Sequence, residues 1–392
     1  QRVARKVRLM AQVRLSALGK DFGSFRALDG VTLTVEDGEL FALLGPSGCG
    51  KTTALRCVAG LEQPSDGDIF IGAQSVLKRP PNERPCGMVF QGYALFPHLS
   101  VFDNVAYGLR AHEYAQSGPV GKGLVLGSFV SQRLFPPSAT MRHRVNDALQ
   151  LVDLAGEAER MPGQLSGGMQ QRVALARAIV TEPEVLLLDE PLSNLDRKLR
   201  VSMRSMIRKL QQQLHITAIY VTHDQEEALS LADRIAIMDH GRLVQLGTPA
   251  EIYDAPATPF VADFIGAENL LPGTVAGLVG DELVVRTAAL EIRAAGRVTG
   301  NAGATGARVR VVVRPQAIRI APSREALDVE NVFDGTVRFG AYLGATARYE
   351  VEVADTLFIV DVPDPRPGAL LRAGDRVGLG FSANSVILVS EA

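Results

Sequence analysis

Between residues 145 and 262 the hydrophobic positions follow two alternating patterns. Continuous apolar runs lie in "VLLLDE" at 185–190, "TAIYVT" at 217–222 and "RIAIMD" at 234–239, and the stretches between them carry apolar residues at helical spacing. A continuous apolar run is typical of a strand buried on both faces, whereas a 3.6-residue period is typical of an amphipathic helix. Their alternation predicts a parallel β-sheet covered by helices.

Two other regions differ from this pattern. In "VTLTVEDGELFALLG", alternating residues lead to a turn at Asp37-Gly38 and then to a buried-type strand at 40–44. From about residue 270 the chain changes to short strands and Gly-rich turns, in which "GTVAGLVGDELVV" at Gly273 resembles "GTVRFGAYLGATARYEV" at Gly335. The likeness predicts two copies of a small antiparallel unit in a paired β-barrel, with a chance match as the alternative.

Length and composition define the class of protein. A chain of 392 residues is longer than one compact domain needs, and we expect two domains, at 11–265 and 270–392. A net charge of −2 gives no general reason to expect nucleic acid. No apolar stretch reaches the roughly eighteen residues of a spanning helix, and we expect no signal peptide. The three cysteines form neither a disulfide nor a zinc pattern, which fits the cytoplasm.

The segment "GPSGCGKTT" fits the phosphate-loop pattern G-x-x-x-x-G-K-[ST], and it lies between a predicted strand and a helical pattern, as the motif requires. Its glycines allow backbone N–H groups to point at phosphate oxygens, Lys51 can reach the β- and γ-phosphates, and the Thr52 hydroxyl can ligate Mg²⁺. The following helix adds its positive N-terminal dipole. The predicted nucleotide-contacting residues here are Gly45, Pro46, Ser47, Gly48, Cys49, Gly50, Lys51, Thr52 and Thr53.

Polar residues follow three of the predicted strands. "VLLLDEP" delivers Asp189 and Glu190 to the carboxyl end of its strand, where open α/β sheets bind ligands. We expect Asp189 to hold Mg²⁺ through water and Glu190 to polarise an attacking water; the alternative for Glu190 is a helix cap. His223 ends "TAIYVTH" and is expected to point at the γ-phosphate. Gln91 follows "CGMVF" and can reach Mg²⁺ or the attacking water.

A second glycine loop precedes another predicted helix. Ser166, Gly167 and Gly168 come before "MQQRVALARAIV", whose apolar positions Val173 and Ala176 lie at helical spacing. A helix N-terminus with free backbone donors suits an anion, although the same sequence is also a common turn and cap.

In this order the motifs resemble those of the ATP-binding subunits of ABC transporters, and the resemblance covers essentially the whole chain. They are "KDFG" with Phe22, "GPSGCGKTT", "VFQGYALFP" with Gln91, "LSGGMQQR", "VLLLDEP", "SNLD" with Asp196, and His223. The family implies an α/β P-loop domain with a helical subdomain at about 95–180, followed by a small OB-like β-barrel. It also implies that Phe22 stacks on adenine and that Asp196 spans a subunit interface.

The resemblance further implies how the second glycine loop is used. The loop at 166–168 would close on the γ-phosphate bound by the other subunit, so that two ATPs lie head-to-tail in a two-fold homodimer. The implied partners are an integral membrane permease and, indirectly, a periplasmic or extracellular solute-binding protein, with no nucleic acid. The implied location is peripheral, on the cytoplasmic face of the cell membrane.

The chain departs from the family pattern at two places. Met169 replaces the usual Gln of LSGGQ and cannot donate its hydrogen bonds, so we expect weaker closure rather than inactivity. The connection at about 111–140 is longer than the usual one by about twenty residues and contains "SGPVGKGLVLGSFVSQRLFPPS". It is either a surface loop of the helical subdomain or an added contact with a permease or another subunit.

The C-terminal segment resembles the β-rich accessory domain of importer ATPases, through "VRPQAIRI" at 313–320 and "SANSVILV" at 382–389. This domain either binds a regulatory ligand or only braces the dimer. "LRCVAGLEQP" and "TPFVADFIGAENLLPGTV" are most similar to importers of polyamines, ferric iron and phosphonates. Importers of sugars or sulfate are the alternative. A non-transport ABC ATPase would need a long coiled-coil insertion or two nucleotide domains, and the sequence shows neither.

Overall fold

The computed structural model describes residues 11–118, 136–300, 302–366 and 370–391. The chain forms two compact units, Gln1–Pro249 and Ala250–Ala392. The domain boundary expected at 265–270 stays a prediction. Helices α8 and α9, which precede that boundary in the sequence, lie at the start of the second unit. Within the described residues no helix is long and apolar enough to cross a membrane.

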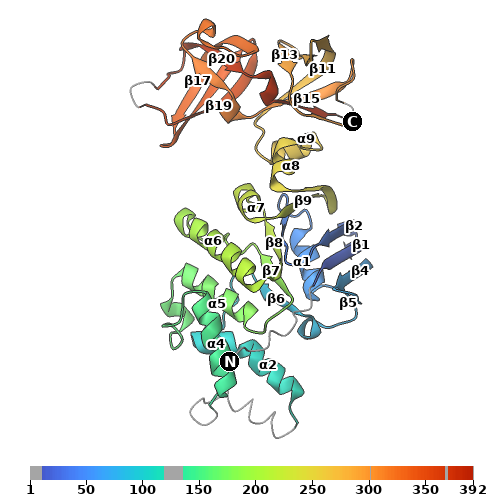
Figure 1. The fold of residues 1–392 in the computed structure, drawn as a ribbon, viewed down its shortest axis with the longest axis vertical. Coiled ribbons are helices and arrows are strands. Elements are labelled where there is room, and N and C mark those ends of the chain that lie inside the picture. Colours follow the sequence, from blue (N-terminus) through green and yellow to red (C-terminus); the bar gives the residue numbers. More distant parts are fainter. Residues whose placement is uncertain (1–10, 119–135, 301, 367–369, 392) are drawn as a thin grey trace. The chain divides into compact units, whose positions relative to one another are not determined.

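The first unit is built on a six-stranded sheet in the order β10-β9-β3-β8-β7-β6. Four of these strands, β9, β8, β7 and β6, are labelled in Figure 1. Strands β9, β3, β8, β7 and β6 run parallel, and β10 is antiparallel to β9. All residues of β3, β7 and β8 are buried, as their apolar runs predict. The strands are β3 (Leu40–Leu44), β6 (Cys86–Val89), β7 (Val185–Asp189), β8 (Thr217–Thr222), β9 (Arg234–Asp239) and β10 (Arg242–Gly247).

Alternate residues of each central strand face different hydrophobic cores. Val185 and Leu187 pack in a cluster with Leu55 of α1 (Lys51–Ala59). Leu186 and Leu188 pack in a second cluster with α6 (Arg197–Leu214), α5 (Gly167–Ile179), α2 (Val101–Gln116) and α4 (Ala139–Leu151). A strand needs a continuous apolar run here because helices cover both of its faces.

A separate antiparallel sheet lies beside the phosphate loop and was not part of the prediction. Its order is β2-β1-β4-β5, with β1 (Val13–Phe22), β2 (Phe25–Val35), β4 (Asp66–Ile71) and β5 (Gln74–Ser75). The β1–β2 hairpin turns directly after Phe22. In the helical region, α2 continues to Gln116, so the first residues of the expected insertion extend this helix; residues 119–135 lie outside the described residues.

The second unit contains two short helices and two antiparallel-based sheets that share one hydrophobic core. The sheet orders are β13-β12-β11-β15-β21-β14 and β16-β20-β17-β18-β19. The elements are α8 (Pro249–Asp254), α9 (Pro259–Phe264), β11 (Asn269–Val279), β12 (Glu282–Arg286), β13 (Glu291–Ala294), β14 (Val298–Thr299), β15 (Arg308–Val313), β16 (Arg319–Ala321), β17 (Asn331–Tyr342), β18 (Thr346–Val353), β19 (Thr356–Pro363), β20 (Arg376–Phe381) and β21 (Val386–Ser390).

The internal repeat predicted from the sequence is present in this unit. The meander β11–β12–β13 has its counterpart in β17–β18–β19, and a Cβ on Gly273 or on Gly335 would lie 2.7 or 2.6 Å from a valine of the next strand. The two copies also exchange strands, because β16 pairs with β20 and β21 pairs with β15. Each sheet is therefore completed by a strand that follows the other copy.

Candidate active site

The phosphate loop joins β3 to α1, and its backbone leaves no room for side chains at two glycines. A Cβ on Gly45 would lie 2.2 Å from the carbonyl oxygen of Met238, and one on Gly50 would lie 2.5 Å from that of Ala27. Gly50 also has a φ of 103°, in the left-handed region that favours glycine. Lys51 is buried, and its Nζ donates to the carbonyl oxygens of Gly45 and Pro46, at 2.7 Å each. The ammonium group therefore lies within the loop.

Thr52 and Asp189 meet beside this loop. The Thr52 Oγ1 hydroxyl donates to Asp189 Oδ1 at 2.9 Å, which links the start of α1 to the end of β7. Burial raises the pKa of the Asp189 carboxyl, and the hydrogen bond from Thr52 opposes this rise. A hydroxyl oxygen and a carboxylate oxygen in contact are the type of ligand pair that Mg²⁺ prefers.

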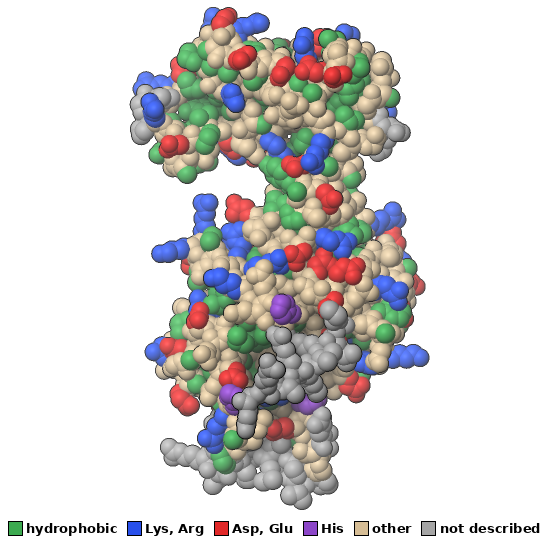
Figure 2. Space-filling model, viewed as in Figure 1, with side chains coloured by type: hydrophobic (Ala, Val, Ile, Leu, Met, Phe, Trp, Pro, Cys, Tyr) green, Lys and Arg blue, Asp and Glu red, His purple; other side chains and the backbone are tan. Residues whose placement is uncertain are grey.

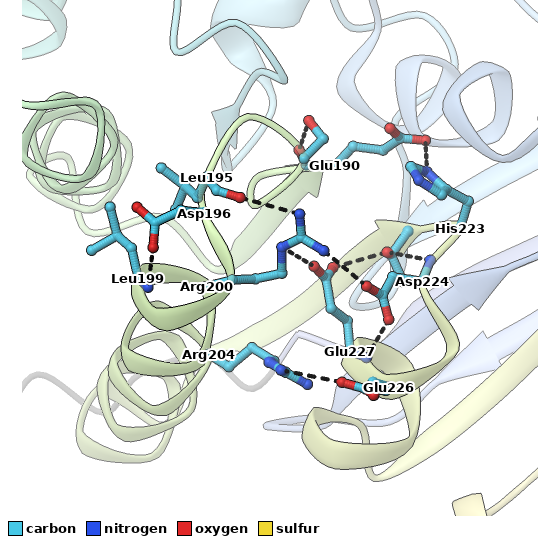
Figure 3. A network of polar contacts seen from close by, with 12 residues as sticks. Glu190, Leu195, Asp196, Leu199, Arg200, Arg204, His223, Asp224, Glu226 and Glu227 are labelled. Carbon is cyan, nitrogen blue, oxygen red and sulfur yellow. Dashed lines mark hydrogen bonds and ion pairs between the residues drawn. The ribbon is translucent and has the colours of Figure 1, made fainter. Parts of the chain in front are cut away.

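Glu190 contacts both of the other predicted polar residues, and its contact with His223 is drawn in Figure 3. Its Oε1 is 3.1 Å from His223 Nδ1, and its Oε2 accepts a hydrogen bond from Gln91 Nε2 at 3.1 Å. These residues follow β7, β8 and β6, which are neighbours in the parallel sheet, so their side chains meet at the same edge. Glu190 has a φ of 43°, an unfavourable value for a residue with a side chain, and its N–H donates to the Val221 carbonyl at 3.0 Å.

Two predicted loops form helix caps rather than contacts with the phosphate loop. Ser166 caps α5 by accepting the N–H of Met169 at 3.4 Å, and Asp196 caps α6 by accepting the N–H of Leu199 at 3.0 Å. In the part of the chain that the structure describes, the hydrogen bonds of the 166–168 loop stay within its own helix region. One subunit therefore does not bring its two glycine loops together.

Phe22 lies at the end of β1, where 46% of its surface is exposed. The Nζ of Lys20 lies 4.7 Å from the centre of its ring. One ring face is thus covered by a cation, and the aromatic side chain remains accessible to a ligand.

The amino-acid sequence of this chain is similar to those of known protein families. It matches the ABC transporter family over residues 28–193 and the TOBE domain family over residues 311–389. The Fe(3+) ions import ATP-binding protein FbpC of Rhizobium etli is 46% identical over 372 residues, which cover 95% of this chain and 96% of that protein. This chain belongs to the ABC transporter family.

Other relatives agree with this assignment. The spermidine/putrescine import ATP-binding protein PotA of Rubrobacter xylanophilus is 44% identical, over 96% of this chain and 93% of that protein. The dimeric structure of the bacterial ABC transporter cassette MJ0796 matches with a TM-score of 0.50 at 28% identity, over 60% of this chain and 98% of that chain. The predicted family, the fold class and the ATP-hydrolysing activity of an import-type ATP-binding subunit are confirmed.

In this ABC ATPase, sequence reasoning missed the residues that hold the polar loops. Arg177 of α5 donates to the carbonyl oxygens of Tyr93 and Ala94 at 2.8 and 2.6 Å, directly after Gln91. Asn194 Nδ2 donates to the Gln91 carbonyl oxygen at 3.1 Å. The signal for Arg177 was a charged residue within the apolar pattern "VALARAIV", because an arginine that is partly withdrawn from water requires acceptors.

Proposed function

We propose that this ABC ATPase hydrolyses Mg²⁺-ATP at two composite sites of a homodimer and so drives solute import through a separate membrane permease. The observation that carries this proposal is the Glu190 carboxylate, which lies between Gln91 and His223 and next in sequence to the buried Asp189. A carboxylate so placed can accept a proton from a water molecule that attacks a phosphate.

The phosphate loop supplies the binding part of the site. Lys51 and the loop N–H groups from Gly45 to Thr53 would surround the β- and γ-phosphates, while Phe22 would stack on the adenine. Thr52, Asp189 and Gln91 supply oxygen ligands that fit Mg²⁺. Among the described residues no group of three or more His, Cys, Asp or Glu side chains is arranged for a metal ion, so nucleotide oxygens would complete the set. When bound, Mg²⁺ would neutralise charge on the phosphates.

The hydrolytic step would depend on three side chains. Glu190 accepts the proton of the attacking water, the new P–O bond forms at the γ-phosphorus, and the bond to the β-phosphate oxygen breaks to release ADP. Gln91 orients the water, and His223 donates a hydrogen bond to the γ-phosphate. The 3.1 Å contacts of Glu190 with both residues support this division of roles.

The second glycine loop would complete the site of the other subunit. Ser166, Gly167 and Gly168 present the N-terminus of α5, which suits the γ-phosphate bound by the partner. Asp196 would lie at the same interface. The separation of the two glycine loops within one subunit, and the dimer described for the MJ0796 cassette, support this arrangement.

The remaining partners follow from the import-type relatives. We propose an integral membrane permease as the direct partner, a periplasmic or extracellular solute-binding protein as the indirect one, and a peripheral position on the cytoplasmic face of the membrane. On the face drawn in Figure 2, the Lys and Arg side chains of the described residues are interspersed with Asp and Glu. This mixed charge favours protein partners over nucleic acid.

The solute is proposed to be small and charged. Relatives named for Fe(3+) and for spermidine/putrescine import support ferric iron or a polyamine, with a phosphonate as the third candidate and sugars or sulfate as the alternative. Uptake of labelled iron and of spermidine by a deletion strain is the measurement. We expect loss of one of these activities, and a defect confined to maltose-type sugars would contradict the proposal.

Glu190→Gln tests the composite site. The amide keeps the shape of the side chain but cannot accept the proton, so ATP should remain bound between the two subunits. We expect size-exclusion chromatography to show about twice the subunit mass with Mg²⁺-ATP, and turnover to fall by about a hundredfold or more. Lys51→Ala is the control that should lose nucleotide binding and therefore stay monomeric.

Cross-linking identifies the loops that meet. Ser47 and Ser166 are exposed, and Ser47→Cys with Ser166→Cys should form an ATP-dependent disulfide between subunits in the Glu190→Gln background. The native thiols interfere little, because burial raises the pKa of Cys49, raises that of Cys57 to about 11 and raises that of Cys86 to about 12. Ser166→Arg should block ATP-driven dimer formation. If it does not, the 166–168 loop is only a helix cap.

A further inference from the structure

A row of arginines on α6 faces acidic residues on α7 (Gln225–Leu231) and on the segments next to it (Figure 3). Arg200 pairs with Asp224 at 3.2 Å, and Arg204 pairs with Glu226 at 3.6 Å. The two arginines lie one turn apart on the same helix face. Only Arg200 makes contacts that reach the polar loops of the active site.

Arg200 contacts three different parts of the structure. Its Nη2 donates to the carbonyl oxygen of Leu195 at 3.1 Å, and its Nη1 donates to Asp224 Oδ2 at 3.2 Å. Its Nε lies 3.8 Å from Glu227 Oε1, and 30% of its side chain is exposed. Leu195 directly precedes Asp196, which caps α6, and Asp224 directly follows His223.

The turn that carries His223 is held by further hydrogen bonds on its other side. The N–H of Asp224 donates to Thr222 Oγ1 at 3.0 Å, and Asp224 accepts the N–H of Glu227 at 3.2 Å. Glu227 is buried and accepts hydrogen bonds from Thr222 Oγ1 and from the Tyr220 hydroxyl, at 2.9 and 2.8 Å. These hydrogen bonds hold the turn together internally, and Arg200 links this turn to Leu195.

A small cavity connects Arg200 with the catalytic carboxylate. It has a volume of about 40 Å³, and Glu190, His223, Arg200 and Glu227 are among the residues that line it. A polar cavity of this size has room for a water molecule. Arg200 therefore borders the same small cavity as the Glu190–His223 pair.

We propose that Arg200 is a positioning residue for ATP hydrolysis, which ties the Leu195–Asp196 turn to the His223–Asp224 turn. This inference rests on the proposed roles of Glu190 and His223. Arginine suits the task because its planar group donates in two directions at once, whereas a lysine ammonium has no such fixed fork. Without the tie, His223 loses its fixed position relative to Glu190, and misplacement by about 1 Å can lower a rate by about a hundredfold.

A comparison of Arg200→Met with the matched control Arg204→Met separates an effect on the position of His223 from an effect on the stability of the fold. The control removes the same side-chain type from the same helix face and breaks the contacts with Glu226 and Ser230, neither of which belongs to the His223–Asp224 turn. The measurements are kcat, KM for ATP and Tm of the full-length chain. We expect Arg200→Met to lower kcat by about tenfold or more, with KM within twofold and Tm close to that of Arg204→Met. Equal kcat values for the two variants would overturn the inference.

Asp224→Asn tests the same tie from its other end and keeps a side chain that caps α7. We expect a lower kcat, and the double variant Arg200→Met/Asp224→Asn should be no slower than the slower single variant. Multiplicative losses would show that the two residues act separately and would overturn the inference. Lys51→Ala tests the proposed function separately. If Lys51→Ala retains ATP turnover, the proposed function itself is contradicted. If Lys51→Ala loses turnover but Arg200→Met keeps the kcat of the unmodified protein, only the role of Arg200 is contradicted.

Discussion

Phe22 offers its ring at the end of β1, with Lys20 near one face and Phe25 opposite it across the hairpin. Both aromatic residues are exposed, Phe22 by 46% and Phe25 by 61%. At the scale of single residues, the structure thus provides two candidate surfaces for adenine. The family resemblance selects Phe22.

Phe22→Ala should raise KM for ATP, because stacking of a base on an aromatic ring contributes about 1–3 kcal/mol. We expect an increase of about tenfold with little change in kcat, measured by steady-state hydrolysis of ATP. Phe25→Ala is the matched control and should leave KM within twofold. The reverse result would assign the adenine contact to Phe25.

At the scale of elements, α5 connects the 166–168 loop with the polar loops of its own subunit. Its N-terminus packs tightly on α6, since a Cβ on Gly168 would lie 2.6 Å from Leu199 Cδ2. Farther along, Arg177 holds the backbone that follows Gln91. Met169 is half-buried and packs against the large hydrophobic cluster of this region. A movement of α5 would therefore displace both α6 and the backbone that follows Gln91.

Met169→Gln separates the hydrogen bonding of residue 169 at the dimer interface from its apolar packing within the subunit. An amide restores the donor that the family pattern has at the dimer interface, so ATP hydrolysis should be equal or improved. The loss of apolar contact should lower Tm by a few degrees, which corresponds to about 1 kcal/mol. Steady-state ATPase assays and thermal unfolding measure the two effects. A clear loss of activity would mean that Met169 packing is required for closure.

At the scale of the whole molecule, each compact unit has its own hydrophobic core. In the second unit a pair of buried asparagines joins the two repeats. Asn269 exchanges hydrogen bonds with the backbone of Ile359 in the second repeat, and Asn331 does the same with Arg293 in the first. The two residues occupy equivalent positions at the starts of β11 and β17.

Asn269→Ala and Asn331→Ala should each lower the unfolding free energy of this unit by about 2–3 kcal/mol, since each leaves buried backbone groups without partners. Asn384→Ala, at an exposed position, is the control and should have no measurable effect. Calorimetry of the full-length chain with and without ATP identifies the transition, because ATP should stabilise only the first unit. An unchanged second transition would contradict this role for the asparagines.

Elements that depend on interactions between nearby residues could be predicted from the sequence. The apolar runs of β3, β7 and β8, the phosphate loop and the helix N-terminus at Ser166 depend on residues within a few positions of each other, so their patterns could be recognised directly. Their order identified the family, and with it the ATPase activity. The positions of Glu190, His223 and Gln91 at strand ends could be predicted in the same way, whereas the contacts of Glu190 with the other two residues were found only in the structure.

Contacts between segments that are distant in the sequence depend on how the whole chain folds. The packing of α8 and α9 with the β-rich unit, the exchange of β16 and β21 between repeats, and the tie from Arg200 to Leu195 and Asp224 leave no local pattern in the sequence. An arginine on a polar helix face has the same sequence signature whether it meets water or a distant carboxylate. Only the packing of α6 against α7 brings Arg200 to Asp224, and so next to the residues that carry out the reaction.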